Sequence, residues 1–251
     1  MSPEMTRFKK LTLVVGVPST IQWFQKFASC YMNMTTYFNN HRVEQYKEQR
    51  LHAHTTVGSI LPKSRMEILR GAKELDADFL LWLDSDHTFP KSMIHRMIHG
   101  MLVNNYDVLA ANCVTKTMPC KPTARNKPVA GSTEWRKVYT DPTSPEYEKV
   151  DRIGTGVMML SRRAIQALPL SCFPMFWRDD VQDYQGEDWS MVDELDKLGF
   201  EIWIDHPLSA HVGHLGIFEF THQYVGETVV EPIGEPDAEQ EETPRVVLAH
   251  A

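Results

Sequence analysis

Short apolar runs alternate with amphipathic segments along most of the chain. The unbroken apolar run 79–83 is typical of a strand buried on both faces. Further strands are predicted over residues 11–18, 107–112, 153–161 and 202–204. Residues 50–57 form a less regular candidate strand. Between these runs, apolar side chains recur three and four residues apart, which predicts helices after residue 20 and over 64–75, 92–102, 162–168 and 186–198.

The expected helix starts have polar caps. Ser19 or Thr20 would cap the first helix, and Ser64 would cap the helix before the 79–83 strand. This start places Arg65 in a first helical turn, where the positive end of the helix dipole disfavours a cation. An anionic ligand would relieve that conflict, although an arginine extended into solvent is equally compatible with the sequence.

The alternation of strands and helices predicts an α/β fold with a mostly parallel, Rossmann-like sheet wound with helices in a single domain, residues 1–225. Residues 226–251 are acidic, and we expect a flexible tail there. Residues 115–149 are expected to form a long loop or a small hairpin. It carries a basic cluster that would either meet phosphates or stay solvated: Lys116, Lys121, Arg125 and Lys127.

Charge and cysteine content narrow the class of protein. The net charge of the 251 residues is -7, and most of the excess acid lies in the tail, so the body has no global basic field for nucleic acid. The four cysteines form no CxxC pair, and the start of the chain resembles neither a signal peptide nor a membrane span. We therefore expect a cytoplasmic protein with reduced cysteines and no transmembrane segment.

Two acids end the apolar run 79–83. Asp84 and Asp86, separated by Ser85, follow the strand at once, and a divalent metal is the natural partner of carboxylates in that position. An ordinary solvated junction between strand and loop is the simpler reading of the same residues.

A second group of polar residues follows in the last third of the chain. Glu187 and Asp188 open a helix, where they could serve chemistry or merely compensate the helix dipole. His211 and His214 stand in a glycine-punctuated loop, and one of them is expected to turn inward. Glycines 154 and 156 at the start of a strand indicate close approach of a ligand or of another backbone segment.

Together these motifs resemble a GT-A-fold glycosyltransferase of the family 2-like type. The resemblance runs from about residue 11 to residue 216 and rests on the order and spacing of the motifs. They are Arg65, the 81–86 segment, Gly154-Thr155-Gly156, the 186–190 segment, Gly199-Phe200 and the 213–216 segment.

The resemblance implies a role for each matching residue. Asp84 and Asp86 match the DxD motif and His214 the late metal-binding histidine, with His211 the lesser candidate; Asp188 matches the catalytic base and Glu187 its neighbour. The residues implied to bind the nucleotide sugar are Pro18, Ser19, Arg65, Asp84, Ser85, Gly154, Thr155 and Gly156. The acid that often reads the base after the second strand is missing from residues 50–58, which leaves the nucleotide open.

The expected activity is metal-dependent transfer of a sugar from a nucleoside-diphosphate sugar to an acceptor hydroxyl, with Mn²⁺ or Mg²⁺ as cofactor. The acceptor would be a glycan, a lipid-linked sugar, a small molecule or a modified nucleobase. Attack assisted by Asp188 from the opposite face would invert the anomeric centre, and a front-face route would retain it.

Two other functions fit parts of the sequence. Residues 84–88 also match D-x-D-x-T, the loop of haloacid-dehalogenase-type phosphohydrolases, in which Asp84 would be the nucleophile. That function predicts an acid pair at a second strand tip, but Asp179-Asp180 and Glu187-Asp188 lie in polar, non-strand contexts. A sugar- or nucleotide-binding module without turnover is the other possibility.

Overall fold

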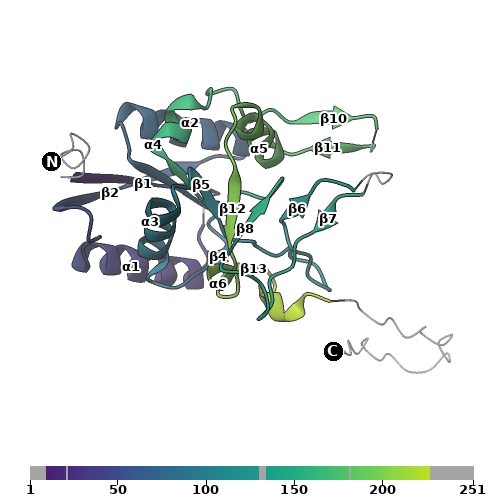
Figure 1. The fold of residues 1–251 in the computed structure, drawn as a ribbon, viewed down its shortest axis with the longest axis horizontal. Helices are drawn as coiled ribbons and strands as arrows, with labels where there is room; N and C mark the ends of the chain where they lie inside the picture. Colours follow the sequence, from purple (N-terminus) through teal and green to yellow (C-terminus); the bar gives the residue numbers. More distant parts are fainter. Residues whose placement is uncertain (1–9, 21, 130–133, 181, 227–251) are drawn as a thin grey trace.

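The computed structural model describes residues 10–20, 22–129, 134–180 and 182–226 (Figure 1). The predicted acidic tail therefore lies outside the described residues, apart from Gly226. Within the described part of the chain, no helix is both long and apolar enough to cross a bilayer. All four cysteines are free.

A seven-stranded mixed sheet forms the centre of the molecule (Figure 1). β3 pairs in parallel with β1 and antiparallel with β9, which separates β3 from β5. Five of the seven strands share one direction, and β9 and β8 oppose it, so the predicted mostly parallel α/β sheet is confirmed. In spatial order the strands are β2 (Glu48–Val57), β1 (Lys10–Ser19), β3 (Phe79–Leu83), β9 (Val157–Ser161), β5 (Val108–Ala110), β12 (Ile202–Asp205) and β8 (Tyr147–Val150).

Helices cover both faces of this sheet (Figure 1). One core cluster contains the buried side of α1 (Gln25–Asn40) and α3 (Met93–Asn104). The other contains the buried sides of α2 (Leu61–Glu74), α4 (Arg162–Ala167) and α5 (Glu187–Lys197). Successive residues of β3 contribute to opposite clusters, which explains why its sequence is apolar without interruption.

Two of the predicted helix starts are wrong. β1 continues to Ser19, which pairs with Val57 of β2, so neither Ser19 nor Thr20 caps α1; that helix begins at Gln25 after Phe24. α2 begins at Leu61, and Ser64 is buried inside it. At Ser19, strand pairing outweighed the capping preference of serine. At Ser64, the helix begins earlier because Pro62 favours the first turn.

Smaller β elements lie around the sheet. A three-stranded sheet joins β4 (His87–Thr88), β13 (Gly213–Leu215) and β14 (Glu219–Phe220), followed by the 3₁₀ turn η2 (His222–Tyr224). The basic insertion contains the hairpin of β6 (Arg125–Asn126) and β7 (Arg136–Lys137). A second hairpin of β10 (Phe176–Arg178) and β11 (Asp183–Gln185) leads into α5, and α6 (His206–Ser209) follows β12.

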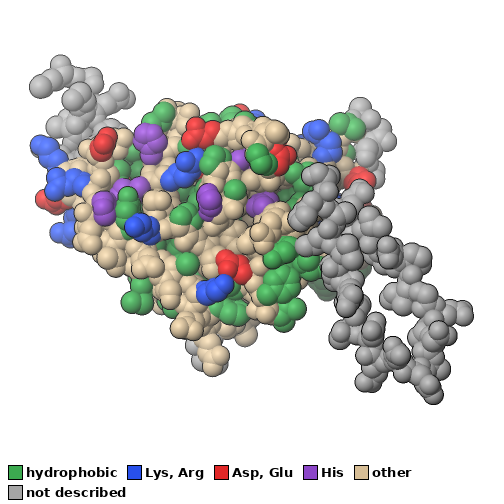
Figure 2. All heavy atoms as spheres, turned by 90° about the horizontal axis from the view of Figure 1, so that it is seen from below, with side chains coloured by type: hydrophobic (Ala, Val, Ile, Leu, Met, Phe, Trp, Pro, Cys, Tyr) green, Lys and Arg blue, Asp and Glu red, His purple; other side chains and the backbone are tan. Residues whose placement is uncertain are grey.

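The surface seen from below mixes charges of both signs. In Figure 2 lysine and arginine side chains gather at the left end of the molecule and are otherwise scattered among acidic and histidine side chains. A local basic strip, which the near-neutral charge of the body leaves open, does not run across this face.

Candidate active site

The candidate site begins at the carboxyl end of β3. Asp84, Ser85 and Asp86 follow the strand directly and are half-buried. Gly156, just before β9, accepts a hydrogen bond from the Asp84 amide (2.9 Å) and so fixes one side of the turn. On the other side, β1 is in register with β3 at Gly16 and Trp82, so Pro18 and Ser19 extend to the level of the acids.

Arg65 joins the DxD turn to the start of α5. Its Nη2 lies 3.0 and 3.2 Å from the two carboxylate oxygens of Asp84, and its Nε lies 3.2 Å from Oε1 of Glu187. The arginine side chain is only 2% exposed. Burial alone would lower the pKa of Arg65, but Asp84 and Glu187 outweigh it and keep the guanidinium charged.

Arg65 does not lie in the first turn of its helix, where the sequence placed it. Because α2 begins at Leu61, Arg65 lies in the second turn, where the helix dipole has little effect. Its anionic partners are two carboxylates of the protein, where the sequence suggested an anionic ligand or solvent. Nη1 of Arg65 has no hydrogen-bond partner among the described residues, so one buried donor remains available to a ligand.

Asp86 lies between two histidines. Its Oδ2 is 3.4 Å from Nε2 of His214, and its Oδ1 is 3.2 Å from Nδ1 of His87. The two rings stack with centroids 4.3 Å apart, because β4 and β13 pair with His87 opposite His214. Nδ1 of His214 contacts the Val114 carbonyl at 2.7 Å, which leaves Nε2 directed at Asp86.

This trio fits a metal ion. One ligand atom from each of Asp86, His87 and His214 can be chosen so that all lie within 4.8 Å of one another. His87 is buried. Apart from the 3.2 Å contact of Nδ1 with Asp86, its ring nitrogens have no partner within the described part of the chain. Such unsatisfied buried nitrogens are costly and indicate a missing ligand.

Sequence reasoning missed His87. Its position directly after the DxD motif could have marked it as a metal ligand. In the D-x-D-x-T pattern, however, the same residue is an unspecified position. His211, the lesser candidate, lies elsewhere: it is exposed, and its amide donates to the Leu208 carbonyl in the turn after α6.

Lys116 from the basic insertion reaches the same carboxylate. Its Nζ is 2.5 Å from Oδ2 of Asp86. Burial alone would raise the pKa of Asp86, but the contacts with His214, His87 and Lys116 outweigh it and hold that pKa far below its usual range. Asp86 is therefore a carboxylate that stays ionised and attracts cations.

Asp188 lies in the first turn of α5, next to Glu187. Burial, followed by the neighbouring charge of Glu187, raises the pKa of Asp188 above its ordinary value. Its Oδ1 accepts a hydrogen bond from the Trp189 amide (2.7 Å), and its Oδ2 faces Gly154, where a Cβ atom would be 3.6 Å away. Thr155, in the same glycine segment, is buried, and its hydroxyl has no partner among the described residues.

Comparisons with known proteins are consistent with this geometry. Residues 67–168 match the family model described as glycosyl transferase family 2. No curated protein sequence matches the chain. Among solved structures, A197 from STIV is similar with a TM-score of 0.55 at 13% identity, over 90% of this chain and 100% of that one.

A second similar structure is GalNAc-T7 with UDP, GalNAc and Mn²⁺, with a TM-score of 0.51 at 10% identity. The match covers 82% of this chain and 43% of that one. At such low identities the two structures support the fold alone, and the family match supports the activity. The chain is a glycosyltransferase of the GT-A fold, similar to family 2.

Proposed function

We propose that the protein transfers a sugar from a nucleoside-diphosphate sugar to an acceptor hydroxyl in a metal-dependent reaction. The observation that carries this proposal is the trio of Asp86, His87 and His214 beside the Arg65–Asp84 pair. It combines a cation site and a buried guanidinium at the carboxyl end of the central strands, where ligands of open α/β sheets bind.

The donor atoms and charges of the site suit a divalent ion. Two imidazoles and one carboxylate favour a first-row transition metal such as Mn²⁺ over Mg²⁺, which prefers oxygen ligands. The site also holds four carboxylates (Asp84, Asp86, Glu187, Asp188) against two fixed cations (Arg65, Lys116), an excess that equals the charge of one divalent ion. The Mn²⁺ in the similar GalNAc-T7 structure supports the same choice.

In this proposal Asp86, His87 and His214 hold the metal, with Asp84 at its edge. When bound, the ion stabilises the negative charge that develops on the departing diphosphate. Arg65 orients Asp84 towards the ribose or the metal's water and offers Nη1 to a phosphate oxygen. Pro18, Ser19, Ser85 and the 154–156 segment form the walls of the nucleotide-sugar pocket.

Asp188 is proposed as the base. It takes the proton from the acceptor hydroxyl while the acceptor oxygen bonds to the anomeric carbon and the bond from that carbon to the diphosphate breaks. A raised pKa suits this task, because the protonated product is then less costly. Glu187, held by Arg65, keeps α5 and therefore Asp188 in place. If the acceptor attacks opposite the diphosphate, the anomeric centre inverts.

The phosphohydrolase alternative requires Asp84 to be a free nucleophile. Both of its oxygens instead accept hydrogen bonds from Arg65, which stabilises the ionised group but ties it down. The geometry therefore favours Asp84 as a binding residue.

A screen of nucleoside-diphosphate sugars tests the proposal. We expect at least one donor to be hydrolysed slowly in the presence of Mn²⁺, and the same donor to raise the melting temperature. Asp188→Asn should retain that thermal shift and lose transfer. Absence of a response to every donor, together with a phosphatase activity that Asp84→Asn abolishes, would contradict it.

A further inference from the structure

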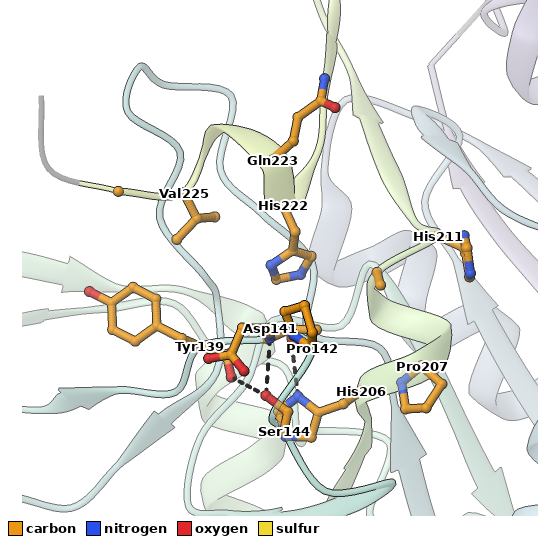
Figure 3. Close-up of a pocket in the computed structure, with 13 residues that line it drawn as sticks. Tyr139, Asp141, Pro142, Ser144, His206, Pro207, His211, His222, Gln223 and Val225 are labelled. Atoms are coloured by element: carbon orange, nitrogen blue, oxygen red, sulfur yellow. Dashed lines mark hydrogen bonds between the residues drawn. The ribbon is translucent and has the colours of Figure 1, made fainter. Parts of the chain in front are cut away.

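A large cavity lies apart from the metal trio (Figure 3). Its volume is about 730 Å³, which is within the ~300–1,000 Å³ typical of small-molecule sites. It opens between the 139–144 loop, α6 and η2, and none of the proposed metal ligands or the base lines it. His211, which the sequence suggested as a lesser metal ligand, is part of its wall.

The cavity shares a backbone segment with the active site. The Val114 carbonyl orients His214 at the metal trio, and two residues earlier the Asn112 carbonyl accepts a hydrogen bond from Nε2 of His222 at 2.6 Å. His222 projects from η2 into the cavity towards Pro142 (Figure 3). One short segment thus separates the two sites.

The charge of the lining limits what can bind. Among the described lining residues there is no lysine or arginine, and Asp141 is the only formally charged side chain. Burial lowers the pKa of His222, so this histidine stays neutral, and His206 already has both ring nitrogens paired, with Thr140 and Glu148. A phosphate or another anion would meet no fixed cation here and would face a carboxylate.

The remaining chemistry suits hydroxyl groups on a partly apolar ring. Because Nε2 of His222 carries the proton donated to Asn112, Nδ1 is an acceptor, and it has no partner among the described residues. Tyr139, which is half exposed, and the two prolines 142 and 207 supply flat apolar surface. Saccharides present C–H faces to such surfaces and hydroxyl donors to such acceptors.

Two further hollows share a lining residue with the cavity. Tyr139 lines all three, and the last of them, about 320 Å³, is also lined by Trp135 of the β6–β7 hairpin region. The guanidinium of Arg152 lies 4.3 Å from the Trp135 ring centroid and 4.9 Å from that of Trp189, the residue after Asp188. These two hollows are also lined by the cations Lys121, Arg136 and Lys137, so the absence of lysine and arginine holds for the 730 Å³ cavity alone.

We propose that this cavity binds a neutral saccharide, and that this saccharide is a distal part of the acceptor. The assignment of acceptor rests on the proposed function, whereas saccharide binding by the cavity does not.

The test is saturation-transfer NMR on the full-length protein, without metal or donor, using a panel of neutral gluco-, galacto- and manno-oligosaccharides. Ala210→Trp fills the cavity from an exposed position and removes no side-chain hydrogen bond, so the signal should disappear; Val103→Trp adds the same ring to the exposed side of α3 and should leave it intact. Tyr139→Ala should weaken binding at least about 5-fold, and Tyr184→Ala, at another exposed tyrosine, should not.

The results test separately whether the cavity binds a saccharide and whether that saccharide is the acceptor. Saccharide binding that survives Ala210→Trp, or a preference for sulfated over neutral oligosaccharides of equal size, would overturn the cavity assignment. Binding that Ala210→Trp abolishes in a protein that turns over no sugar donor would support the cavity while refuting the proposed function. A donor-active enzyme whose transfer to the bound oligosaccharide is unaffected by Ala210→Trp would overturn the acceptor role.

Discussion

At the scale of single residues, Arg65 is the point on which the site depends. Its side chain is 2% exposed and lies between Asp84 of the DxD turn, which is 27% exposed, and Glu187 of α5, which is 10% exposed. Removing one partner of a buried ion pair leaves the other charge unpaired, which costs far more than losing a surface pair.

We therefore expect Arg65→Met to lower the free energy of unfolding by about 3–5 kcal/mol. Urea denaturation followed by tryptophan fluorescence measures this difference. Arg163→Ala is the matched control, because Arg163 pairs with Asp107 at the surface, and its cost should be about 1 kcal/mol or less. Equal costs for the two variants would show that the Arg65 pairs are not buried as described.

His87 should contribute to metal affinity although it stands outside the DxD motif. Replacing it with alanine removes one of three proposed ligands, so we expect Mn²⁺ affinity, measured by isothermal titration calorimetry, to fall at least about 10- to 100-fold. His211→Ala, at an exposed histidine outside the trio, should not change it. Unchanged affinity in His87→Ala would reduce the site to Asp86 and His214.

Asp188 should make stability depend on pH. Its pKa is raised in the folded protein, so folding penalises the ionised form, and stability falls as pH rises from the unfolded-state pKa of ~3.9 through the folded value. Asp188→Asn removes that penalty. The variant should therefore be more stable than the wild type at pH 7.5 and lose the advantage near pH 4, as measured by urea denaturation at both values. A variant less stable than the wild type at pH 7.5 would contradict the assigned shift.

At the scale of elements, the site depends on two strand pairings. β9 runs antiparallel between β3 and β5 and brings Gly156 against the DxD turn, and β4 pairs with β13 so that His87 faces His214. A Cβ on Gly156 would lie 2.7 Å from Cε1 and 2.8 Å from Nε2 of His87, closer than packed atoms tolerate.

Gly156→Ala should consequently displace the His87 ring. The expected result is weaker Mn²⁺ binding in calorimetry, by about 10-fold or more, with a smaller loss of thermal stability. Gly58→Ala is the control, since its added methyl would meet only Ser64 Oγ at 3.5 Å, an ordinary contact. If both variants bind Mn²⁺ like the wild type, His87 does not occupy the described position.

These strand pairings separate what the sequence could predict from what it could not. The unbroken apolar run of β3 and the helical spacing of α2, α3 and α5 identified those elements, because local patterning reports which faces are buried. The order of strands could not be predicted, since nothing local to Val157–Ser161 says that it enters between β3 and β5 in the opposite direction. His87 was missed for the same reason: its role comes from pairing with a strand more than a hundred residues away.

At the scale of the whole molecule, the helices on the two faces form separate core clusters, and the site lies at one edge of the sheet between them. Its proposed ligands come from the DxD turn with β4 and from β13, which lie far apart along the chain, so a metal that binds them ties distant segments together. Binding to the folded state alone then stabilises the entire fold.

Mn²⁺ at 100 times its dissociation constant should add about 2.7 kcal/mol to the stability. For a chain of this length that corresponds to a rise in melting temperature of about 5–10 °C, which differential scanning calorimetry can detect. Asp86→Asn should show no such rise at the same concentration. A similar rise in this variant would place the ion elsewhere.

The contact between Lys116 and Asp86 has a consequence for how the ion arrives. The acid is already neutralised by an ammonium group at 2.5 Å, so loading the site is an exchange of one cation for another and not the filling of a bare anion. Such exchange lowers the apparent affinity for every divalent ion and releases a lysine beside the diphosphate that comes with the donor. The enzyme would thus hold its ion firmly only when the substrate's phosphates give the displaced ammonium a new counter-charge.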